Sequence, residues 1–543
     1  MGQSSESSRA ARRLTFTLSE LLARQALHPV PALIERGKTV SFAALAEASR
    51  RVAGGLYRLG VAPGDRVALW LPSTTAWLSV FFACAQLGAI AIAVNTRFRS
   101  HELTDVLARS GAKALVFWPG FKGIDFGGTL AVCDAHALER LQSVVAYSED
   151  GMPAPRLLAG KAVFDYATLS SGEPLLENRA KAEAACVMFT TSGTTNAPKF
   201  VLHSHRAVIR HALDVARGFA IGADSNLLLI PPLCGVYGFC SAMAALAAGR
   251  PAIIAPVWDP EQAARDIVAH GITHATGTDD AVVQLLAQSQ AERPFPSLRF
   301  FGYAPFNPSL GDIVERADAR GMKLVGLYGS SEVQALFSRQ HEDAPLAERR
   351  VAGGLPVSAR ARVRARDPQS ATLLPHGEAG ELEFYAPTSS MLGYFGDAEA
   401  TSRAFTEDGY VRSGDLGCTQ PDGRFVFLTR IGDSLRLGGF LVNPAEIESV
   451  MQEVPGIAGC QVVGIPAQDG LEPIAFVLLE PGANLDERAA IQHVAARLAR
   501  YKVPRRIFAI EAFPVTPGAN ATKIQKHKLR DMALQLVRGY LTK

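Results

Sequence analysis

Short apolar runs alternate with stretches of helical periodicity over most of the chain. One helical stretch is PEQAARDIVAHG at 260–271. The apolar runs are rich in aliphatic residues, as buried strands are. They occupy 65–71, 89–94, 112–117, 185–190, 226–230, 251–255, 298–304 and 322–328. This alternation predicts an α/β protein with largely parallel sheets and crossover helices.

The pattern changes near residue 380, where the strands become shorter and the turns closer together. GELEFY at 380–385 and DGYVRSGDLG at 408–417 are followed by QPDGRFVFLTR at 420–430. The PDG sequence between apolar runs predicts a β-hairpin. After Arg430 we expect a shorter α+β segment.

One uncharged stretch, AWLSVFFACAQLGAIAIAV at 76–94, is about long enough to cross a bilayer. Gly88 divides it, however, into a part typical of a buried helix and a part typical of a buried strand. We therefore predict no membrane span and a soluble protein. The N-terminal MGQSSESS has Glu6 where a myristoylation signal needs Ser or Thr, and no apolar signal region follows. Residues 1–14 are expected to be a disordered tail.

Composition excludes several classes of protein. The chain has 543 residues, 48% of them hydrophobic and 20% charged, so more than one globular unit is expected. A net charge of +3 gives no reason to expect a nucleic-acid partner. Within 497–543, however, 11 Lys or Arg stand against two acids, which indicates either a solvated basic face or a cap over a polyanionic substrate.

The spacing of the cysteines and histidines does not predict a metal site formed by these residues. There are seven cysteines, an odd number without a CxxC pair, and the twelve histidines form no ligand-spaced cluster. We expect buried thiols in a reducing compartment such as the cytoplasm. The cysteines are Cys84, Cys133, Cys186, Cys234, Cys240, Cys418 and Cys460.

The segment VMFTTSGTTNAPKF at 187–200 carries the strongest chemical signal. A buried strand leads directly into a run of small hydroxyl residues around one glycine, and Pro198 and Lys199 close the run. Backbone N–H groups and hydroxyls that converge in this way, with a mobile lysine, form a cradle for phosphate oxygens. The pattern is not a Walker A loop. The cradle residues are Thr190, Thr191, Ser192, Gly193, Thr194, Thr195 and Lys199.

TTSGTTNAPK resembles the phosphate-loop signature of the adenylate-forming superfamily, which includes acyl-CoA synthetases, luciferases and peptide-synthetase adenylation domains. Four further segments are similar to motifs of that superfamily, in the same order along almost the whole chain. They are LYGSSE (327–332), VRSGDLG (411–417), TRIGDSLRLGGFLVNPAEIE (429–448) and TKIQKHKLR (522–530).

The resemblance implies a large N-terminal α/β domain over 15–430 and a small mobile C-terminal domain over 431–543. It also implies a two-step reaction. A small-molecule carboxylic acid attacks the α-phosphate of ATP to give acyl-adenylate and pyrophosphate, and a thiol, usually that of coenzyme A, then takes the acyl group. Because two anions must approach each other in the first step, catalysis should consist of charge neutralisation and positioning.

By resemblance, Glu332 would hold the Mg²⁺ that bridges phosphate oxygens, and Ser331 would bond the α-phosphate. Gly329 and Ser330 complete this turn. Tyr328 would lie against adenine, whereas without the resemblance a core aromatic at a strand end would be the simpler interpretation.

The remaining nucleotide contacts follow from the later motifs. Asp415 would accept both ribose hydroxyls, although an Asp in this context also caps turns. Arg430 would reach the ribose or the phosphates. Lys523 would enter the site during adenylation, whereas a lysine in a basic tail is otherwise solvent-facing.

GYAP at 302–305 resembles the adenine-side loop, so Gly302 and Ala304 are expected near adenine. An acyl pocket formed by Gly235, Tyr237, Gly302 and Tyr303 is implied. Two nearby acids, Asp279 and Asp280, have two interpretations. We favour the first turn of a helix with Thr278 as its N-cap. The alternative is recognition of a basic or polar acyl group.

Three positions depart from the family pattern. The hinge residue is Gly432, where relatives usually carry Asp or Lys. Thr522 stands in place of the glycine before Lys523, and the preceding segment is slightly longer than usual, so Lys526 is a fallback for the catalytic lysine. Gly235 removes a pocket side chain. None of these changes deletes a charge that the chemistry needs.

The leading prediction is a carboxylate–CoA ligase that uses ATP, Mg²⁺ and coenzyme A, with Arg436, Gly438 and Gly439 near the loop that admits the thiol. The alternatives are an adenylating enzyme that loads a carrier protein and a nucleotide-binding relative without turnover. The sequence leaves open the acyl group, for which family frequency suggests a medium-chain or aromatic acid. It also leaves open whether the chain forms a homodimer.

Overall fold

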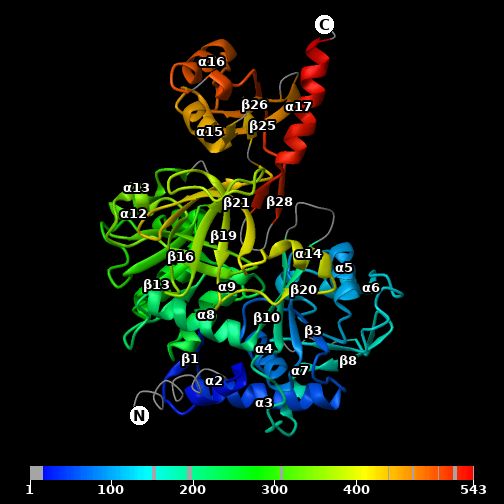
Figure 1. Cartoon of the computed structure of the whole chain (residues 1–543). Coiled ribbons are helices and arrows are strands. Elements are labelled where there is room, and N and C mark those ends of the chain that lie inside the picture. The colour runs from blue at the N-terminus through cyan, green and yellow to red at the C-terminus, as the bar shows by residue number, and fades with distance from the viewer. Residues whose placement is uncertain are drawn as a thin grey trace.

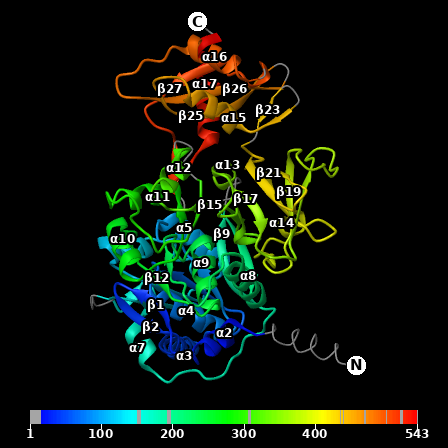
Figure 2. The same cartoon turned by 90° about the vertical axis from the view of Figure 1, so that its left-hand side faces the viewer.

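The computed structural model describes residues 16–149, 155–191, 198–305, 310–433, 435–437, 440–467, 470–498, 500–517 and 522–541. Residues 1–14, predicted to be a disordered tail, lie outside the described residues, as does the centre of the phosphate-loop segment, Ser192, Gly193, Thr194 and Thr195. In Figures 1 and 2 the C-terminal part of the chain, from orange to red, stands apart from a larger body formed by the rest.

The larger body contains a nine-stranded sheet in which six central strands run parallel. The antiparallel strands β10 and β20 lie at one edge, and β7 lies at the other. In spatial order the strands are β20 (Gly393–Tyr394), β10 (Lys199–Ser204), β9 (Ala185–Thr191), β4 (Ile90–Ala93), β3 (Arg66–Trp70), β5 (Ala114–Phe117), β6 (Ser143–Ala146), β8 (Lys161–Asp165) and β7 (Leu157–Leu158).

A second sheet has thirteen strands, parallel from β1 to β15 and antiparallel beyond β15. In spatial order they are β18 (Arg362–Arg366), β19 (Gly380–Tyr385), β21 (Val411–Thr419), β22 (Phe425–Arg430), β17 (Gly353–Pro356), β16 (Gln334–Arg339), β15 (Leu324–Ser330), β14 (Phe300–Ala304), β13 (His274–Thr278), β11 (Leu227–Leu229), β12 (Ala252–Ile254), β1 (Pro31–Glu35) and β2 (Lys38–Ser41). The predicted α/β fold is confirmed, and so is the β21–β22 hairpin. Parallel pairing is confined to the six central strands of the first sheet and to the strands from β1 to β15 of the second, so the second sheet is less parallel than predicted.

Buried helices join the two sheets into one hydrophobic core. Helix α8 (His205–Gly218) contacts β10 of one sheet and β16 of the other, and α9 (Val236–Ala247) contacts β11, β12 and β16. Helices α2 (Leu18–Gln25), α3 (Phe42–Arg58) and α4 (Thr75–Leu87) pack against one another beside this core. The other helices of the body are α5 (Ser100–Ser110), α6 (Phe126–Ala131), α7 (Tyr166–Ser171), α10 (Pro260–Ala269), α11 (Asp279–Leu286), α12 (Ile313–Asp318), α13 (Leu346–Arg349) and α14 (Ala398–Ala404).

The uncharged stretch at 76–94 forms helix α4 and strand β4, as predicted. Gly88 ends the helix in the left-handed conformation, with φ of +72°. Across the part of the chain that the structure describes, no helix combines the length and the apolar character that a membrane span needs. The seven cysteines are unpaired, and six of them are buried. Among the described residues, no cluster of His, Cys, Asp and Glu has the geometry of a metal site.

The C-terminal part has its own small sheet and its own hydrophobic clusters. The sheet consists of β25 (Ile457–Ala467), β26 (Gly470–Leu479) and β27 (Arg506–Ala509). Helices α15 (Pro444–Gln452), α16 (Glu487–Ala495) and α17 (Lys526–Leu541) accompany it. Two ribbons, β23 (Leu435–Leu437) with β24 (Phe440–Val442) and β28 (Val515–Pro517) with β29 (Thr522–Ile524), complete this part. In Figure 1, β28 lies on the side of the larger body.

Candidate active site

Three residues predicted to contact the nucleotide, Asp415, Arg430 and Tyr328, come from three strands and meet in one cluster. Asp415 on β21 and Arg430 on β22 are direct partners in the antiparallel register, and Arg430 Nε lies 2.9 Å from Asp415 Oδ1. The hydroxyl of Tyr328, near the end of β15, donates a hydrogen bond of 2.6 Å to Asp415 Oδ2. Asp415 is 2% exposed, whereas the side chain of Arg430 is 51% exposed. The cluster therefore holds a buried carboxylate against a cation that solvent reaches.

The surroundings of the Asp415 carboxyl raise its pKa above the ordinary value. Burial raises its pKa to about 6, while the Arg430 guanidinium and the Tyr328 hydroxyl oppose that increase. Burial, together with the charge of Asp415, also raises the pKa of Tyr328 well above its ordinary value, so the phenol stays protonated and can donate. At pH 7 this group is an ionised acceptor in an enclosed position, as a ligand with paired hydroxyls requires.

Tyr328 is a core residue as well as a partner of Asp415. Its ring lies 5.1 Å from that of Phe384 and 5.2 Å from that of Phe425, measured between centroids. The Tyr328 ring is thus packed in the hydrophobic core, as the simpler interpretation of the sequence expected. Contact of Tyr328 with adenine stays a prediction.

Glu332 lies in the short turn between β15 and β16, because Ser330 and Gln334 pair across that turn. The Tyr394 hydroxyl donates a hydrogen bond of 3.0 Å to Glu332 Oε1. Lys199 Nζ lies 4.6 Å from the centre of the Tyr394 ring. The structure therefore brings the predicted residues Glu332 and Lys199 together through a third residue.

The sequence prediction missed Tyr394. It lies on β20, which pairs with β10 immediately after Lys199, with Val201 opposite Tyr394. The available signal was the Gly-Tyr-Phe segment at 393–395 followed by Asp397, the N-cap of α14. That signal marks a turn, but it does not identify Glu332 as the partner.

The Glu332 carboxylate suits a hard divalent cation. Among the described residues, only its Oε1 accepts a hydrogen bond, and a carboxylate oxygen is the ligand that such a cation prefers. Mg²⁺ commonly uses one protein carboxylate together with phosphate oxygens of the substrate. Glu332 would supply the carboxylate, and both Glu332 and Lys199 contact Tyr394. The donor set therefore fits Mg²⁺.

The ends of the phosphate loop meet in the nine-stranded sheet. Thr191 ends β9 and Lys199 begins β10, and the two residues are paired in the antiparallel register. Arg109 lies beside this junction, and its Nη2 donates a hydrogen bond of 2.7 Å to the carbonyl of Pro198. The two ends of this segment, Thr191 and Lys199, thus lie side by side in the sheet.

Part of the predicted acyl pocket comes together around Tyr237. The buried Tyr237 hydroxyl lies 2.9 Å from the carbonyl oxygen of Gly277 and 3.1 Å from that of Gly302. Tyr303, in contrast, belongs to the hydrophobic cluster on the other face of the sheet, and its hydroxyl donates a hydrogen bond to the Arg350 carbonyl. Neighbouring residues of a strand face opposite sides, so Gly302 and Tyr303 do not share one wall. Gly235 is the N-cap of α9.

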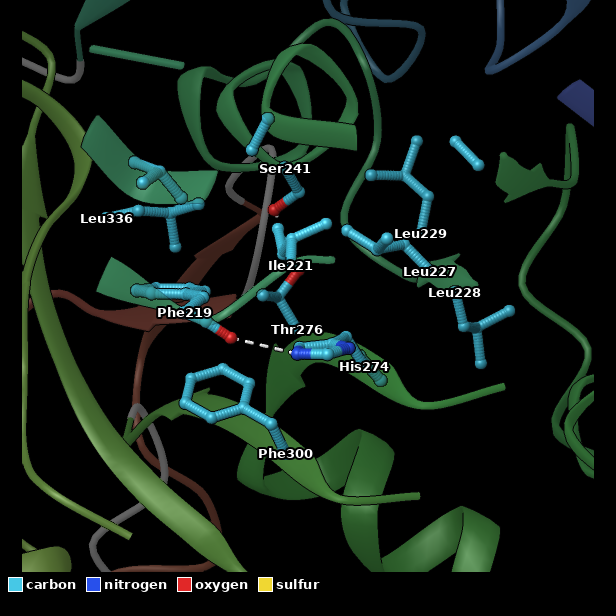
Figure 3. A pocket seen from close by; sticks show the side chains of 14 residues that line it. Phe219, Ile221, Leu227, Leu228, Leu229, Ser241, His274, Thr276, Phe300 and Leu336 are labelled. Atoms are coloured by element: carbon cyan, nitrogen blue, oxygen red, sulfur yellow. Dashed lines mark hydrogen bonds between the residues drawn. The ribbon is translucent and has the colours of Figure 1, made fainter. Parts of the chain in front are cut away.

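A small cavity lies one helical turn along α9 from Tyr237 (Figure 3). Its volume is about 10 Å³, close to the space of one water molecule. Ser241 on its wall donates to the carbonyl of Tyr237 and lies 2.7 Å from the hydroxyl of Thr276. His274 donates to the carbonyl of Phe219, the bond drawn in Figure 3. The rest of the lining is mainly apolar: Val215, Ile221, Leu227, Leu228, Leu229, Ala244, Ala252, Ala275, Phe300 and Leu336.

The capping interpretation of the two acids near this region is confirmed. Thr278 is the N-cap of α11 and accepts a hydrogen bond from the N–H of Ala281. Asp279 and Asp280 occupy the first turn, where negative charge is favourable. Recognition of a basic acyl group is not needed to explain them.

The C-terminal part contributes two lysines with different surroundings. Lys523 lies on β29, opposite Thr516 of β28. Lys526 Nζ donates a hydrogen bond of 2.8 Å to Glu448 Oε1, and the same carboxylate oxygen accepts from the N–H of Val462. Lys526 is therefore engaged inside its own domain, which disfavours it as the fallback for a catalytic role.

The predicted hinge residue Gly432 lies in a turn after β22, and an added Cβ would meet no atom within 4 Å. Glycine is thus not required there for space. Of the predicted coenzyme A residues, Gly438 and Gly439 lie outside the described residues, and for Arg436 the structure describes only its place on β23. These assignments stay predictions.

The comparison with protein families places two models on the chain. Residues 23–395 match the model described as AMP-binding enzyme. Residues 446–519 match the AMP-binding enzyme C-terminal domain.

Similar proteins cover almost the whole chain. The (7a-methyl-1,5-dioxo-octahydro-1H-inden-4-yl)propanoyl:CoA ligase of Mycobacterium tuberculosis is 30% identical, with 92% of this chain and 95% of that protein covered. Feruloyl-CoA synthase of an Amycolatopsis species is 29% identical, with 90% and 93% covered. The solved structure of ATP-bound MatB from Rhodopseudomonas palustris superposes with a TM-score of 0.79 at 24% identity, covering 95% of this chain and 99% of MatB. This last likeness concerns the fold.

Proposed function

The chain belongs to the AMP-binding enzyme family, and we propose that it activates a small carboxylic acid with ATP and transfers the acyl group to coenzyme A. The similar proteins of known name are CoA ligases that differ in the acid they use, and the chain is accordingly an AMP-forming acid–thiol ligase. The observation that carries the proposal is the meeting of Asp415, Tyr328 and Arg430, together with Lys199 and Glu332, which both contact Tyr394.

In the proposed first step the nucleotide is fixed by its sugar and phosphates. Asp415 accepts the hydrogen bonds of the ribose hydroxyls, and Arg430 keeps that carboxylate ionised and lies near the phosphates. Tyr328 orients Asp415 from the core side. Because these groups are held before the ligand arrives, little reorganisation is needed on binding.

Charge neutralisation is the second requirement. Lys199 and the hydroxyl-rich loop bind phosphate oxygens, and Glu332 holds Mg²⁺, with Tyr394 fixing the position of the carboxylate. The bound Mg²⁺ ion supplies positive charge to the polyphosphate. The acid then approaches the α-phosphate against reduced repulsion.

The C-terminal part completes the site in the proposal. Lys523 is delivered by the β28–β29 ribbon for adenylation, and rotation near Gly432 replaces it with the surface that includes Arg436, Gly438 and Gly439 for the thiol. The domain boundaries of 15–430 and 431–543 belong to this proposal. The seven free thiols support a reducing compartment such as the cytoplasm.

Tyr237 is expected to limit the length of the acid, because its hydroxyl contacts the Gly302 carbonyl of the predicted acyl pocket and the cavity lined by Ser241 and Thr276 lies one helical turn further along α9. In Tyr237→Ala the space left by the ring would enlarge the predicted acyl pocket. We expect kcat/KM for acids about one ring longer to rise roughly tenfold relative to shorter ones, in keeping with ~1–3 kcal/mol for a pocket change. Steady-state kinetics on a length series measures this change.

Tyr237→Phe is the matched control, since it keeps the ring and removes only the hydroxyl. It should retain the length preference. Its free energy of unfolding should fall by ~1–3 kcal/mol, because the carbonyls of Gly277 and Gly302 lose their hydrogen-bond donor. An unchanged length preference in Tyr237→Ala would contradict the assignment of Tyr237 as the floor of the pocket.

The function is tested by pyrophosphate release from ATP and Mg²⁺ across a panel of carboxylic acids, with and without coenzyme A. The proposal expects turnover that needs both one class of acid and coenzyme A, with acyl-CoA as the product. Release that is independent of coenzyme A would favour a carrier protein as acceptor. Absence of release across a broad panel, with ATP still bound, would contradict the proposed enzyme.

A further inference from the structure

The turn that carries Glu332 has an unusual backbone. Gln334 and Leu336 follow Glu332 closely, and both adopt left-handed conformations, with φ of +66° and +64°. Residues other than glycine avoid this region because the Cβ atom crowds the carbonyl oxygen. Such a conformation persists only where the surroundings hold it. The turn therefore needs a set of contacts that fix it.

Two buried histidines provide contacts on either side of Glu332. His203 on β10 lies with Nε2 2.7 Å from the carbonyl oxygen of Ser331. His211 on α8 lies with Nε2 2.6 Å from the carbonyl oxygen of Ala335. Because a carbonyl oxygen only accepts, each imidazole must carry its proton on Nε2 and donate it. One side of the Glu332 turn is thus bonded to β10, through Ser331, and the other to α8, through Ala335.

Other bonds complete the enclosure of the turn. The Gln334 side-chain amide donates to the carbonyls of Ala207 and Ser389, and the N–H of Met391 donates to the Glu332 carbonyl. His203, His211 and Gln334 are almost fully buried. Burial also lowers the pKa of both histidines to about 4, so both are neutral donors at pH 7. Neutral donors hold the turn without placing a competing positive charge beside Glu332.

His203 lies on the same strand as the phosphate-loop lysine, Lys199. His203 is four residues after Lys199 on β10, so the strand that begins with the phosphate-loop lysine also holds the turn of the proposed metal-binding carboxylate. Tyr394, whose hydroxyl binds Glu332, lies on β20, which pairs with the same strand. The paired strands β10 and β20 therefore contact both the backbone of the Glu332 turn and the side chain of Glu332, and β10 also carries Lys199.

We propose that His203 and His211 are positioning residues that fix the Glu332 turn against β10 and α8, and thereby set the affinity of the site for the divalent cation that accompanies ATP. The inference rests on the proposed function. It assigns to the two histidines no contact with substrate, since their bonds end on the carbonyls of Ser331 and Ala335.

The test compares His203→Leu, which removes the donor, with His203→Gln, whose amide can still donate to the Ser331 carbonyl. Mn²⁺ affinity is measured by electron paramagnetic resonance in the presence of an α,β-methylene ATP analogue. We expect His203→Leu to weaken Mn²⁺ binding about tenfold and His203→Gln to restore most of it. His211→Leu and His211→Gln should behave in the same way.

His205→Leu is the matched control. His205 is equally buried on the same segment, but its ring accepts a hydrogen bond from the N–H of Leu18 in α2. His205→Leu should lower the Tm and leave Mn²⁺ affinity within about twofold. If His203→Leu does not fold, His203→Asn, with an amide too short to reach the carbonyl, takes its place.

Two results would overturn the proposal. Equal loss of Mn²⁺ affinity in the His203 and His205 variants would reduce the effect to general destabilisation, and unchanged affinity in His203→Leu would remove the positioning role. Wild-type ATP–pyrophosphate exchange separates these outcomes from a failure of the proposed function. A wild-type protein that shows no exchange with any acid would overturn both proposals, whereas exchange with unaltered variant affinities would overturn only this one.

Discussion

Lys523→Ala is expected to slow acyl-adenylate formation by about three orders of magnitude, as removal of a preorganised charge from an oxyanion typically does. Lys523 lies on the β28–β29 ribbon. In the proposed function this ribbon brings its positive charge to the α-phosphate and the attacking carboxylate. Thioester formation from supplied acyl-adenylate needs no such charge, so its rate should change by less than about twofold. Rapid-quench measurement of the two half-reactions checks both expectations.

The same motif offers two comparisons for Lys523. Lys528 is exposed in α17, so Lys528→Ala removes an equal charge and should leave both half-reactions unchanged. Lys526→Ala breaks the buried pair with Glu448 at a cost of ~3–5 kcal/mol, and it should lower the Tm and slow both half-reactions together. Equal loss of both half-reactions in Lys523→Ala would contradict the catalytic assignment.

The parts of the fold that could be predicted from the sequence are those that local physical chemistry determines. Gly88 divides the apolar stretch into helix and strand because it alone tolerates the left-handed C-cap at that point. Thr278 begins α11 because its hydroxyl accepts a free N–H of the first turn. The PDG turn produces the β21–β22 hairpin for an equally local reason.

The acyl pocket shows how a local rule could have refined the prediction. Gly302 and Tyr303 are neighbours in β14, and strand alternation requires them to face opposite sides of the sheet. The prediction listed both residues in the acyl pocket without assigning each to a face of the sheet. Tyr237 reaches Gly302 from α9, whereas Tyr303 packs on the other face.

The contacts around Glu332 could not be predicted in this way. Tyr394 and His203 are distant from Glu332 in the sequence, and they meet it because β20, β10 and the β15–β16 turn converge in space. A buried histidine is more often a satisfied core residue than a functional one. Only the tertiary structure reveals that this one donates to the Ser331 carbonyl.

Asp415→Asn is expected to weaken AMP and ATP binding by about two orders of magnitude, because an amide cannot accept hydrogen bonds from both ribose hydroxyls as a carboxylate does. Isothermal titration with AMP measures the loss. Asp422→Asn is the matched control, since Asp422 is exposed in the hairpin turn that joins the same two strands. It should leave AMP affinity within about twofold.

The pH dependence gives Asp415 a second, independent test. Binding requires the ionised carboxylate, and its pKa is about 6, so wild-type AMP affinity should fall up to about tenfold per pH unit below that value. Asp415→Asn should remove this pH dependence. A wild-type affinity that stays constant from pH 5 to pH 8 would contradict an ionised Asp415 as the ribose acceptor.

Stability should change in the opposite direction to affinity. The pKa of Asp415 is higher in the folded protein, about 6, than its ordinary value of 3.8, so the folded state binds the proton more tightly between these values. The contribution of this bound proton to the free energy of unfolding is therefore fully present below about pH 4, and it is lost as the pH rises through about 6. Asp415→Asn should therefore gain Tm relative to the wild type across this window and keep the gain at pH 8. If Asp415→Asn loses AMP binding and also has a lower Tm at pH 8, the role of Asp415 is to stabilise the fold. If it loses AMP binding and its Tm is unchanged or higher, Asp415 is a ligand-binding carboxylate that lowers the stability of the protein.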